Sequence, residues 1–206
     1  MVDELLKRFQ IISDQVDTQE LRVILSQLQN LLESKTPGQI LEMGCYVGTT
    51  SLFISRMLNI LGENREYHVY DSFEGLPEKS TQDLSPAGEQ FKAGELYASK
   101  KQFIENYKKA GLQLPRIHKN WFDQLSPEDI PENIAFAFLD GDYYGSIKSC
   151  LSLIENKLVP GAVVIIDDYQ NEALPGARKA ADEWVNKKGL TLRAEKSLAI
   201  INIPKR

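Results

Sequence analysis

Four carboxylates follow two apolar stretches of the chain. Asp140 and Asp142 come after one stretch, and Asp167 and Asp168 come after the next. If the two stretches are neighbouring parallel strands, these side chains meet at one edge of a sheet. Carboxylates left unpaired there would repel one another and lose hydration, and a hard cation such as Mg²⁺, Mn²⁺ or Ca²⁺ would relieve both effects. We therefore favour a metal site over the alternative, a set of helix N-caps and partly solvated turns.

A glycine turn and an acidic strand end indicate a second ligand. The segment from Glu42 through Gly44 to Gly48 has the spacing Glu-x-Gly-x-x-x-Gly after an apolar strand. It lacks the middle glycine of a dinucleotide fingerprint, and its acidic residue suits a cationic or amino-bearing ligand better than a pyrophosphate. Asp71 ends the following strand, where a carboxylate can accept hydrogen bonds from ribose hydroxyls. Structural glycines and a solvated aspartate are the alternatives.

The histidines and cysteines give little indication of a catalytic or metal-binding role. His68 and His118 precede or lie within strand patterns, so we expect both to be structural residues with satisfied hydrogen bonds rather than catalytic bases. Cys45 and Cys150 lie in apolar segments without metal-binding spacing. We expect them to be reduced thiols in the core.

The elements that must position these residues alternate along the chain. The expected strands are 39–43, 67–70, 116–118, 134–139, 162–166, 190–194 and 198–203, and the expected helices are the first 34 residues, the segment from the glycine turn to 61, 100–110, 146–157 and 173–187. This alternation predicts an α/β fold with a mostly parallel sheet of about seven strands and helices on both faces. The last two strands are too close for a helical crossover, so we expect them to pair antiparallel.

The N-terminal region is expected to be a helical extension, residues 1–36, on a main domain of residues 37–206. Asp17 and Glu20 have the spacing of a capping box. The apolar stripe of this region allows two arrangements, burial on the main domain or burial on a second subunit as a homodimer.

The segment 76–99 is long and polar and contains prolines and glycines. Loops longer than about 15 residues are uncommon in compact domains unless they cover a site. We interpret this segment as a lid over the substrate.

Bulk composition narrows the function classes. The chain has 206 residues and a net charge of −5, which argues against a nucleic-acid backbone as the main partner. Its apolar runs are all shorter than the ~18 residues that a membrane span needs. The charged N-terminus lacks the apolar core of a signal peptide, so we expect a cytoplasmic protein that acts on a small molecule.

Between about residues 39 and 184, the chain resembles the macrocin O-methyltransferase family, which methylates sugar hydroxyls in macrolide and aminocoumarin antibiotic pathways. The matching motifs are Tyr-Asp-Ser-Phe-Glu-Gly-Leu-Pro at 70–77, Trp-Phe at 121–122, Leu-Asp-Gly-Asp-Tyr at 139–143, Asp-Asp-Tyr at 167–169 and the helix at 176–184. This resemblance implies a Rossmann-like class I methyltransferase sheet. Val47 departs from the family, which often has arginine there.

The resemblance also implies roles for individual residues. The residues implied to bind S-adenosylmethionine are Glu42, Gly44, Tyr46, Asp71, Ser72, Phe73, Glu74, Gly75, Trp121 and Phe122. Trp121 and Phe122 would lie near the adenine, although ordinary core aromatics would fit the same pattern. Asp140, Asp167 and Asp168 would hold Mg²⁺ (or Mn²⁺), and Asp142 would be the general base.

The reaction implied is metal-assisted methyl transfer to a hydroxyl of a sugar or diol in natural-product biosynthesis. Three alternatives stay open. A catechol or phenol O-methyltransferase would use the same chemistry on another acceptor, and a dinucleotide or nucleotide-sugar enzyme would use a similar sheet. The third alternative is a non-catalytic S-adenosylmethionine-binding protein. The four carboxylates argue against it, because without a catalytic metal there is no reason to keep side chains that repel one another.

Overall fold

The computed structural model describes residues 1–88 and 90–205, and its centre is one seven-stranded sheet. The strands are β1 (Gln39–Met43), β2 (Tyr67–Asp71), β3 (Arg116–Lys119), β4 (Ile134–Leu139), β5 (Leu158–Ile166), β6 (Leu192–Glu195) and β7 (Leu198–Asn202). Their order in the sheet is β3-β2-β1-β4-β5-β7-β6. The first five are parallel, β7 pairs antiparallel with β5, and β6 pairs antiparallel with β7.

This topology confirms the predicted α/β fold with antiparallel strands at the C-terminal end. The main difference in bounds is that β5 begins at Leu158, four residues earlier than its apolar run predicted. The order of the strands reverses between β1 and β4: β2 and β3 follow on one side of this pair, and β5 follows on the other side. Ligands of such sheets bind at this switch point, beyond the carboxyl ends of the strands.

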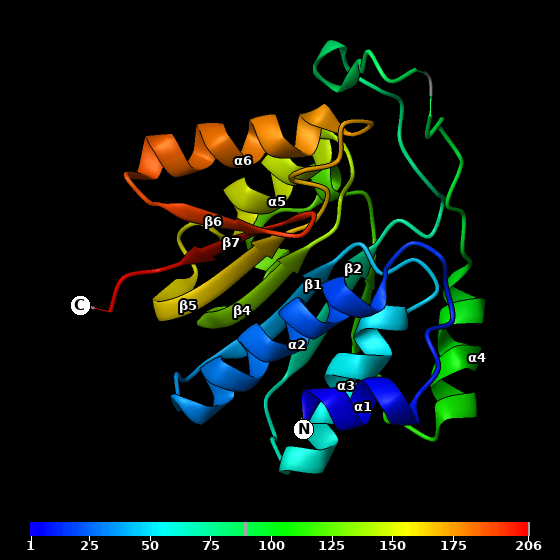
Figure 1. Ribbon diagram of the computed structural model, residues 1–206, viewed down its shortest axis with the longest axis vertical. Helices are drawn as coiled ribbons and strands as arrows, with labels where there is room; N and C mark the ends of the chain where they lie inside the picture. The colour runs from blue at the N-terminus through cyan, green and yellow to red at the C-terminus, as the bar shows by residue number, and fades with distance from the viewer. Residues whose placement is uncertain (89, 206) are drawn as a thin grey trace.

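In the part of the chain that the structure describes, six α-helices cover the two faces of the sheet (Figure 1). They are α1 (Val2–Arg8), α2 (Thr18–Glu33), α3 (Thr49–Leu61), α4 (Lys100–Ala110), α5 (Tyr144–Ile154) and α6 (Pro175–Lys188). The helices α1 to α4 pack in one core with one set of strand side chains, and α5 and α6 pack in a second core with the alternate set. Ile40 and Leu41 of β1, for example, belong to opposite cores, as the period of two along a strand requires.

The N-terminal region corrects one prediction: its first 34 residues are not one helix. Helix α1 ends at Arg8, and the chain is extended at Phe9 before α2 begins after Asp17. The predicted capping box is present, since Asp17 accepts from the backbone of Glu20 at 2.8 Å and the Glu20 carboxylate accepts from the backbone of Asp17 at 2.9 Å. Strong capping at this position stops the helix from continuing backwards.

The apolar stripe of α2 packs against the chain's own sheet, next to β4 and β5. Of the two arrangements that the sequence allowed, burial on the main domain is therefore present. A homodimer through these helices stays a prediction.

Two further findings concern the cysteines and the apolar length of the helices. Cys45 and Cys150 are free and buried, as expected of core thiols. Among the helices of residues 1–88 and 90–205, none is both long enough and apolar enough to cross a membrane.

Candidate active site

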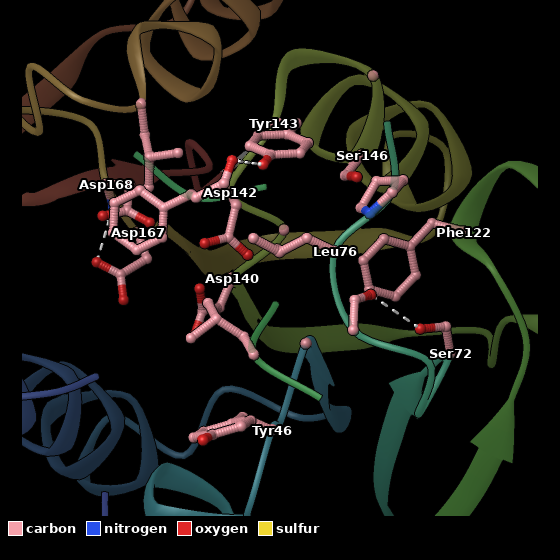
Figure 2. A pocket seen from close by; sticks show the side chains of 18 of the residues that line it. Tyr46, Ser72, Leu76, Phe122, Asp140, Asp142, Tyr143, Ser146, Asp167 and Asp168 are labelled. Atoms are coloured by element: carbon pink, nitrogen blue, oxygen red, sulfur yellow. Dashed lines mark hydrogen bonds between the residues drawn. The ribbon is translucent and has the colours of Figure 1, made fainter. Parts of the chain in front are cut away.

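A cavity of about 1060 Å³ opens at the carboxyl ends of the parallel strands. Most of the residues that the sequence singled out line it: Gly44, Tyr46, Asp71, Ser72, Gly75, Trp121, Phe122, Asp140, Asp142, Asp167 and Asp168. Figure 2 shows the four aspartates that follow β4 and β5 gathered on one side, with Tyr46 and Phe122 on others. The remaining three candidates, Glu42, Phe73 and Glu74, are not among the lining residues.

The glycine turn brings the ends of β1 and β4 into direct contact. Gly44 has a φ of 91°, and a Cβ built on it would lie 1.7 Å from the carbonyl oxygen of Asp140. No side chain fits in that space, so only glycine lets the two strand ends approach. The turn therefore fixes the position of Asp140 relative to β1.

Asp71 organises the same turn through its carboxylate. One oxygen accepts from the backbone N–H groups of Cys45 at 2.8 Å and Tyr46 at 3.1 Å, and the other accepts from Phe73 at 2.7 Å. Tyr46 and Phe73 both have positive φ angles, 48° and 54°. Such angles are strained for residues other than glycine, and these hydrogen bonds help to hold them.

The three candidates that do not line the cavity have other partners. Glu42 is buried, and its carboxylate accepts hydrogen bonds from Ser51 at 2.6 Å and from Tyr67. Burial raises the pKa of Glu42 to about 7. The Phe73 ring packs edge-on against Phe103 in the core, and Glu74 pairs with Lys119 on the surface at 2.6 Å.

Three carboxylates form a compact group that we call the acidic triad: Asp140, Asp142 and Asp168. Each offers one oxygen such that all three lie within 4.8 Å of one another. A cation bound at about 2.0–2.6 Å to each oxygen needs a group of this size. Asp142 and Asp168 have positive φ angles of 58° and 57°, an unusual backbone for residues other than glycine, and Figure 2 shows both side chains near Asp140.

The triad is electrostatically unfavourable without a counterion. Burial raises the pKa of Asp140 well above its usual range, and the charges of Asp167 and Asp142 raise it further. Burial, followed by the charge of Asp168, raises the pKa of Asp142, and burial raises that of Asp168 to about 6. A divalent cation would favour the ionised forms of all three, so the residues present fit a hard metal ion.

Asp167, the fourth carboxylate, lies beside the triad rather than in it. It accepts from the backbone N–H of Asp168 at 2.8 Å, and Ser197 Oγ lies 3.1 Å from the same oxygen. The Ser197 hydroxyl is also 2.5 Å from the carboxylate of Glu20. The turn between β6 and β7 thus joins the capping box of α2 to the edge of the acidic triad.

The segment between β2 and α4 folds over the N-terminal ends of α5 and α6, and this contact depends on Asp83 (Figure 1). Asp83 is buried and lies in a short 3₁₀ turn, Thr81–Asp83. Its carboxylate accepts from the N–H and hydroxyl of Ser80 and from the N–H of Tyr144, the first residue of α5, at 2.6 Å. The Tyr143 hydroxyl donates to the carbonyl of Phe91 at 2.5 Å, which is a second hydrogen bond between this segment and the start of α5.

Replacing Asp83 by alanine is expected to lower the free energy of unfolding by about 1–3 kcal/mol, because buried donors lose their acceptor. The segment 76–99 should also become more accessible. Thermal denaturation and limited proteolysis measure the two effects. Glu78→Ala, which removes an exposed acid of the same segment, is the matched control, and equal behaviour of the two variants would contradict this role of Asp83.

Sequence reasoning missed Asp83, Ser197 and the segment before α2, from which Asp14 and Gln15 line the cavity. The Ser-x-x-Asp spacing at 80–83 is a capping-box signal that could have identified Asp83. No comparable signal marks Ser197, because its partners are distant in sequence.

Comparison with known proteins decides the family. The profile of the macrocin O-methyltransferase (TylF) family matches residues 13–197, which is most of the chain. The chain belongs to this family. The match begins four residues before the N-cap of α2 and ends at Ser197, so the family profile covers the whole cavity.

Two relatives of known name illustrate the relationship. The chain is 31% identical over 180 residues to mycinamicin III 3''-O-methyltransferase of Micromonospora griseorubida, a match that covers 81% of this chain and 69% of that enzyme. It is 30% identical over 171 residues to 8-demethyl-8-(2,3-dimethoxy-alpha-L-rhamnosyl)-tetracenomycin-C 4'-O-methyltransferase of Streptomyces olivaceus. The second match covers 80% of this chain and only 64% of the tetracenomycin enzyme, so that relative is considerably longer than the matched region.

Solved structures agree on the fold. The O-methyltransferase NovP superposes with a TM-score of 0.81 at 22% identity, over 92% of this chain and 81% of that one. The calicheamicin methyltransferase CalS11 superposes with a TM-score of 0.73 at 18% identity, over 98% and 89%. The fold is therefore that of class I methyltransferases, as the sequence predicted.

Proposed function

We propose that this chain transfers the methyl group of S-adenosylmethionine to a hydroxyl of a sugar carried by a small molecule, with Mg²⁺ or Mn²⁺ at the acidic triad. The observation that carries the proposal is that Asp71 and the acidic triad line one cavity at the switch point of the sheet. Family membership supports the donor. The names of the mycinamicin and tetracenomycin relatives support oxygen as the methyl acceptor, and the latter name includes a rhamnosyl group.

The donor would lie along the ends of β1 and β2. Asp71 would accept from the ribose hydroxyls, as acidic residues at this strand end do in related sheets. Tyr46 and the half-buried Trp121 and Phe122 supply flat surfaces elsewhere on the wall of the same cavity. In this arrangement the methyl group would face the acidic triad.

The acidic triad would prepare the acceptor. A divalent cation bound there would lower the pKa of a coordinated hydroxyl. Asp140 and Asp168 are proposed as metal ligands both by the family resemblance and by their place in the acidic triad. Asp167 is proposed as a third ligand by the resemblance alone. Asp142 would accept the hydroxyl proton while the acceptor oxygen forms a bond to the methyl carbon and the bond from that carbon to sulfur breaks.

Replacing Asp71 by alanine is expected to weaken binding of S-adenosylhomocysteine about ten- to a hundredfold, because charge-assisted hydrogen bonds contribute about 1.5–3 kcal/mol. The loss would have two sources, the ribose contacts and the turn that Asp71 tethers. Calorimetry measures the affinity. Glu66→Ala, which removes an exposed acid just before the same strand, should bind like the native protein; unchanged affinity in the Asp71 variant would refute the assignment.

The proposed function is tested by incubating the protein with S-adenosylmethionine, Mg²⁺ and a panel of glycosides, diols and catechols. We expect a mass gain of one methylene group on a glycoside and no gain without protein. Transfer to catechols alone would favour the phenol alternative. Binding of S-adenosylmethionine with no transfer to any acceptor would favour the non-catalytic alternative, and binding of NAD instead of S-adenosylmethionine would refute the proposal.

A further inference from the structure

Two members of the acidic triad lie in loops that lead into helices. Asp142 lies two residues before Tyr144, the first residue of α5, and Asp168 lies in the loop between β5 and α6. Asp140 instead directly follows β4 and lies against Gly44. The distance between the carboxylates of Asp142 and Asp168 therefore depends on how the starts of α5 and α6 are held relative to each other.

The side chain of Asp168 is tied to the loop before α6. Asn171 Nδ2 donates to the Asp168 carboxylate at 2.8 Å, and Asn171 Oδ1 accepts from the N–H of Ala173 at 3.0 Å. The backbone N–H of Asn171 also donates to the carbonyl of Asp168 at 3.1 Å. A shift of this loop would consequently move the carboxylate of Asp168 with it.

Asp83 lies between the starts of the two helices, in residues 80–85, which we call the lid turn. Its side chain is buried, and its Oδ1 accepts from the N–H of Tyr144 at 2.6 Å. On the side of α6, a Cβ built on Gly176 would lie 1.9 Å from the same Asp83 oxygen and 2.6 Å from the nitrogen of Tyr144. The first turns of α5 and α6 and the Asp83 carboxylate are thus in direct contact, and a side chain at Gly176 would separate them.

Further contacts join the lid turn and the residues before it to both loops. Ser85 Oγ donates to the carbonyl of Glu172, in the loop before α6, at 2.6 Å. Leu76 packs with Tyr143 and Leu174 in a small buried cluster, and Figure 2 shows Leu76 and Tyr143 near the acidic triad. The segment that begins the lid therefore contacts each of the two loops that carry members of the acidic triad.

We propose that Asp83 is a positioning residue for the acidic triad: by joining the starts of α5 and α6, it sets the separation of Asp142 and Asp168. The inference rests on the metal site of the proposed function. Groups that orient metal ligands without touching the metal commonly contribute about ten- to a hundredfold to metal affinity. Because coupling between two binding events is reciprocal, a cation that draws these carboxylates together should in turn stabilise the contact between the lid turn and the two helices.

A purely structural role for Asp83 is the alternative, and a second capping box of the chain provides the control. Asp129 accepts from the N–H and from the hydroxyl of Ser126, both at 2.8 Å, in another short 3₁₀ turn with the same Ser-x-x-Asp spacing. Neither residue is among those that line the cavity. Asp129→Ala therefore removes the same kind of cap as Asp83→Ala but no hydrogen bond to the start of α5.

The first measurement is the affinity for Mn²⁺, followed by electron paramagnetic resonance without donor or acceptor, at a temperature at which circular dichroism shows every variant to be folded. Asp83→Ala should weaken Mn²⁺ binding about tenfold or more, and Asp129→Ala should stay within about twofold of the native protein. Asp83→Asn keeps an oxygen that can accept from the N–H of Tyr144, so it should recover most of the affinity. Ser85→Ala, which removes one contact to the loop before α6, should give a smaller loss.

The second measurement is hydrogen exchange at the backbone N–H of Tyr144, followed by NMR. As the first residue of α5, Tyr144 has no acceptor within its own helix, so its exchange reports on the contact with Asp83. Saturating Mg²⁺ should slow this exchange in the native protein by a factor similar to the loss of affinity in Asp83→Ala, as reciprocal coupling requires. The same Mg²⁺ concentration should slow it much less in Asp168→Asn.

The outcomes distinguish the inference from the proposed function. Native Mn²⁺ affinity in Asp83→Ala, or an equal loss in Asp129→Ala, would overturn the positioning role and leave the proposed function standing. If the native protein binds no Mn²⁺, or if Asp168→Asn binds it as tightly, the metal site of the proposed function fails and the inference fails with it. Should Asp83→Ala not fold, native affinity in Ser85→Ala together with no effect of Mg²⁺ on the exchange at Tyr144 would overturn the inference.

Discussion

Replacing Asp142 by asparagine is expected to lower kcat about 10²–10⁴-fold, the usual loss when a general base is removed. Affinity for S-adenosylmethionine should stay near its native value, because the donor would bind at the ends of β1 and β2. The loss should be smaller on a catechol than on a sugar, because a phenolic hydroxyl is more acidic and needs less help from a base. Steady-state kinetics on both acceptors, with calorimetry for the donor, measure these effects.

The same variant distinguishes three roles for Asp142, which the geometry brings within reach of both Asp140 and Asp168. A general base gives a lower kcat at saturating metal. A metal ligand gives a higher metal requirement as the main defect. A helix cap gives a loss of stability of about 1 kcal/mol with little change in kcat. Asp123→Asn, which changes an exposed acid of the cavity outside the triad, is the matched control.

Removing divalent cations is expected to reduce methyl transfer to the background rate, and Mg²⁺ or Mn²⁺ should restore it. The physical reason is the acidic triad: burial, and then the charges of neighbouring carboxylates, raise the pKa of Asp140 and Asp142, and a divalent cation would favour their ionised forms. Assays in EDTA, followed by titration with each metal, measure the dependence. Binding of Mn²⁺ followed by electron paramagnetic resonance gives a readout that does not depend on activity. Full activity in the presence of chelator would show that the acidic triad is structural.

Two variants refine the metal prediction. Asp168→Asn and Asp167→Asn should each raise the metal requirement if both residues are ligands, as the family resemblance implies. In the structure, Asp167 instead accepts from the backbone of Asp168 and lies within reach of Ser197. If Asp167 only positions Asp168, asparagine keeps an acceptor oxygen and its effect should be much the smaller of the two. Mn²⁺ affinities of the two variants decide between ligand and positioning residue.

The sequence was sufficient to predict where the chemistry should lie. Apolar runs that end in aspartate predict buried strands with polar ends, and a parallel sheet brings such ends together whatever the details of packing. For this reason Asp71, Asp140 and Asp168 were found at the cavity without a structure. The spacing of the glycine turn left structural glycines open as an alternative, and the structure shows that at Gly44 a positive φ and a close backbone contact both require glycine.

The details that sequence could not predict depend on distant contacts and unusual backbone angles. Periodicity revealed neither the positive φ angles of Asp142 and Asp168 nor which three of the four carboxylates converge. It also placed a helix through residues 9–17, where the structure has no helix and Asp14 and Gln15 line the cavity. The assignment of Glu42 shows a further limit: spacing located the residue, but not whether its side chain faces the ligand or the core.

The contact of Ser197 with Glu20 and Asp167 has a consequence for how the protein matures during synthesis. The ribosome adds Ser197 to the chain 177 residues after Glu20, and both belong to the wall of the same cavity. Closing so long a loop requires the C-terminal hairpin to have left the ribosome and paired with β5. The end of the sheet that carries the cavity should therefore be completed only after β7 has been made, and a nascent chain that stops before β7 would lack a complete cavity.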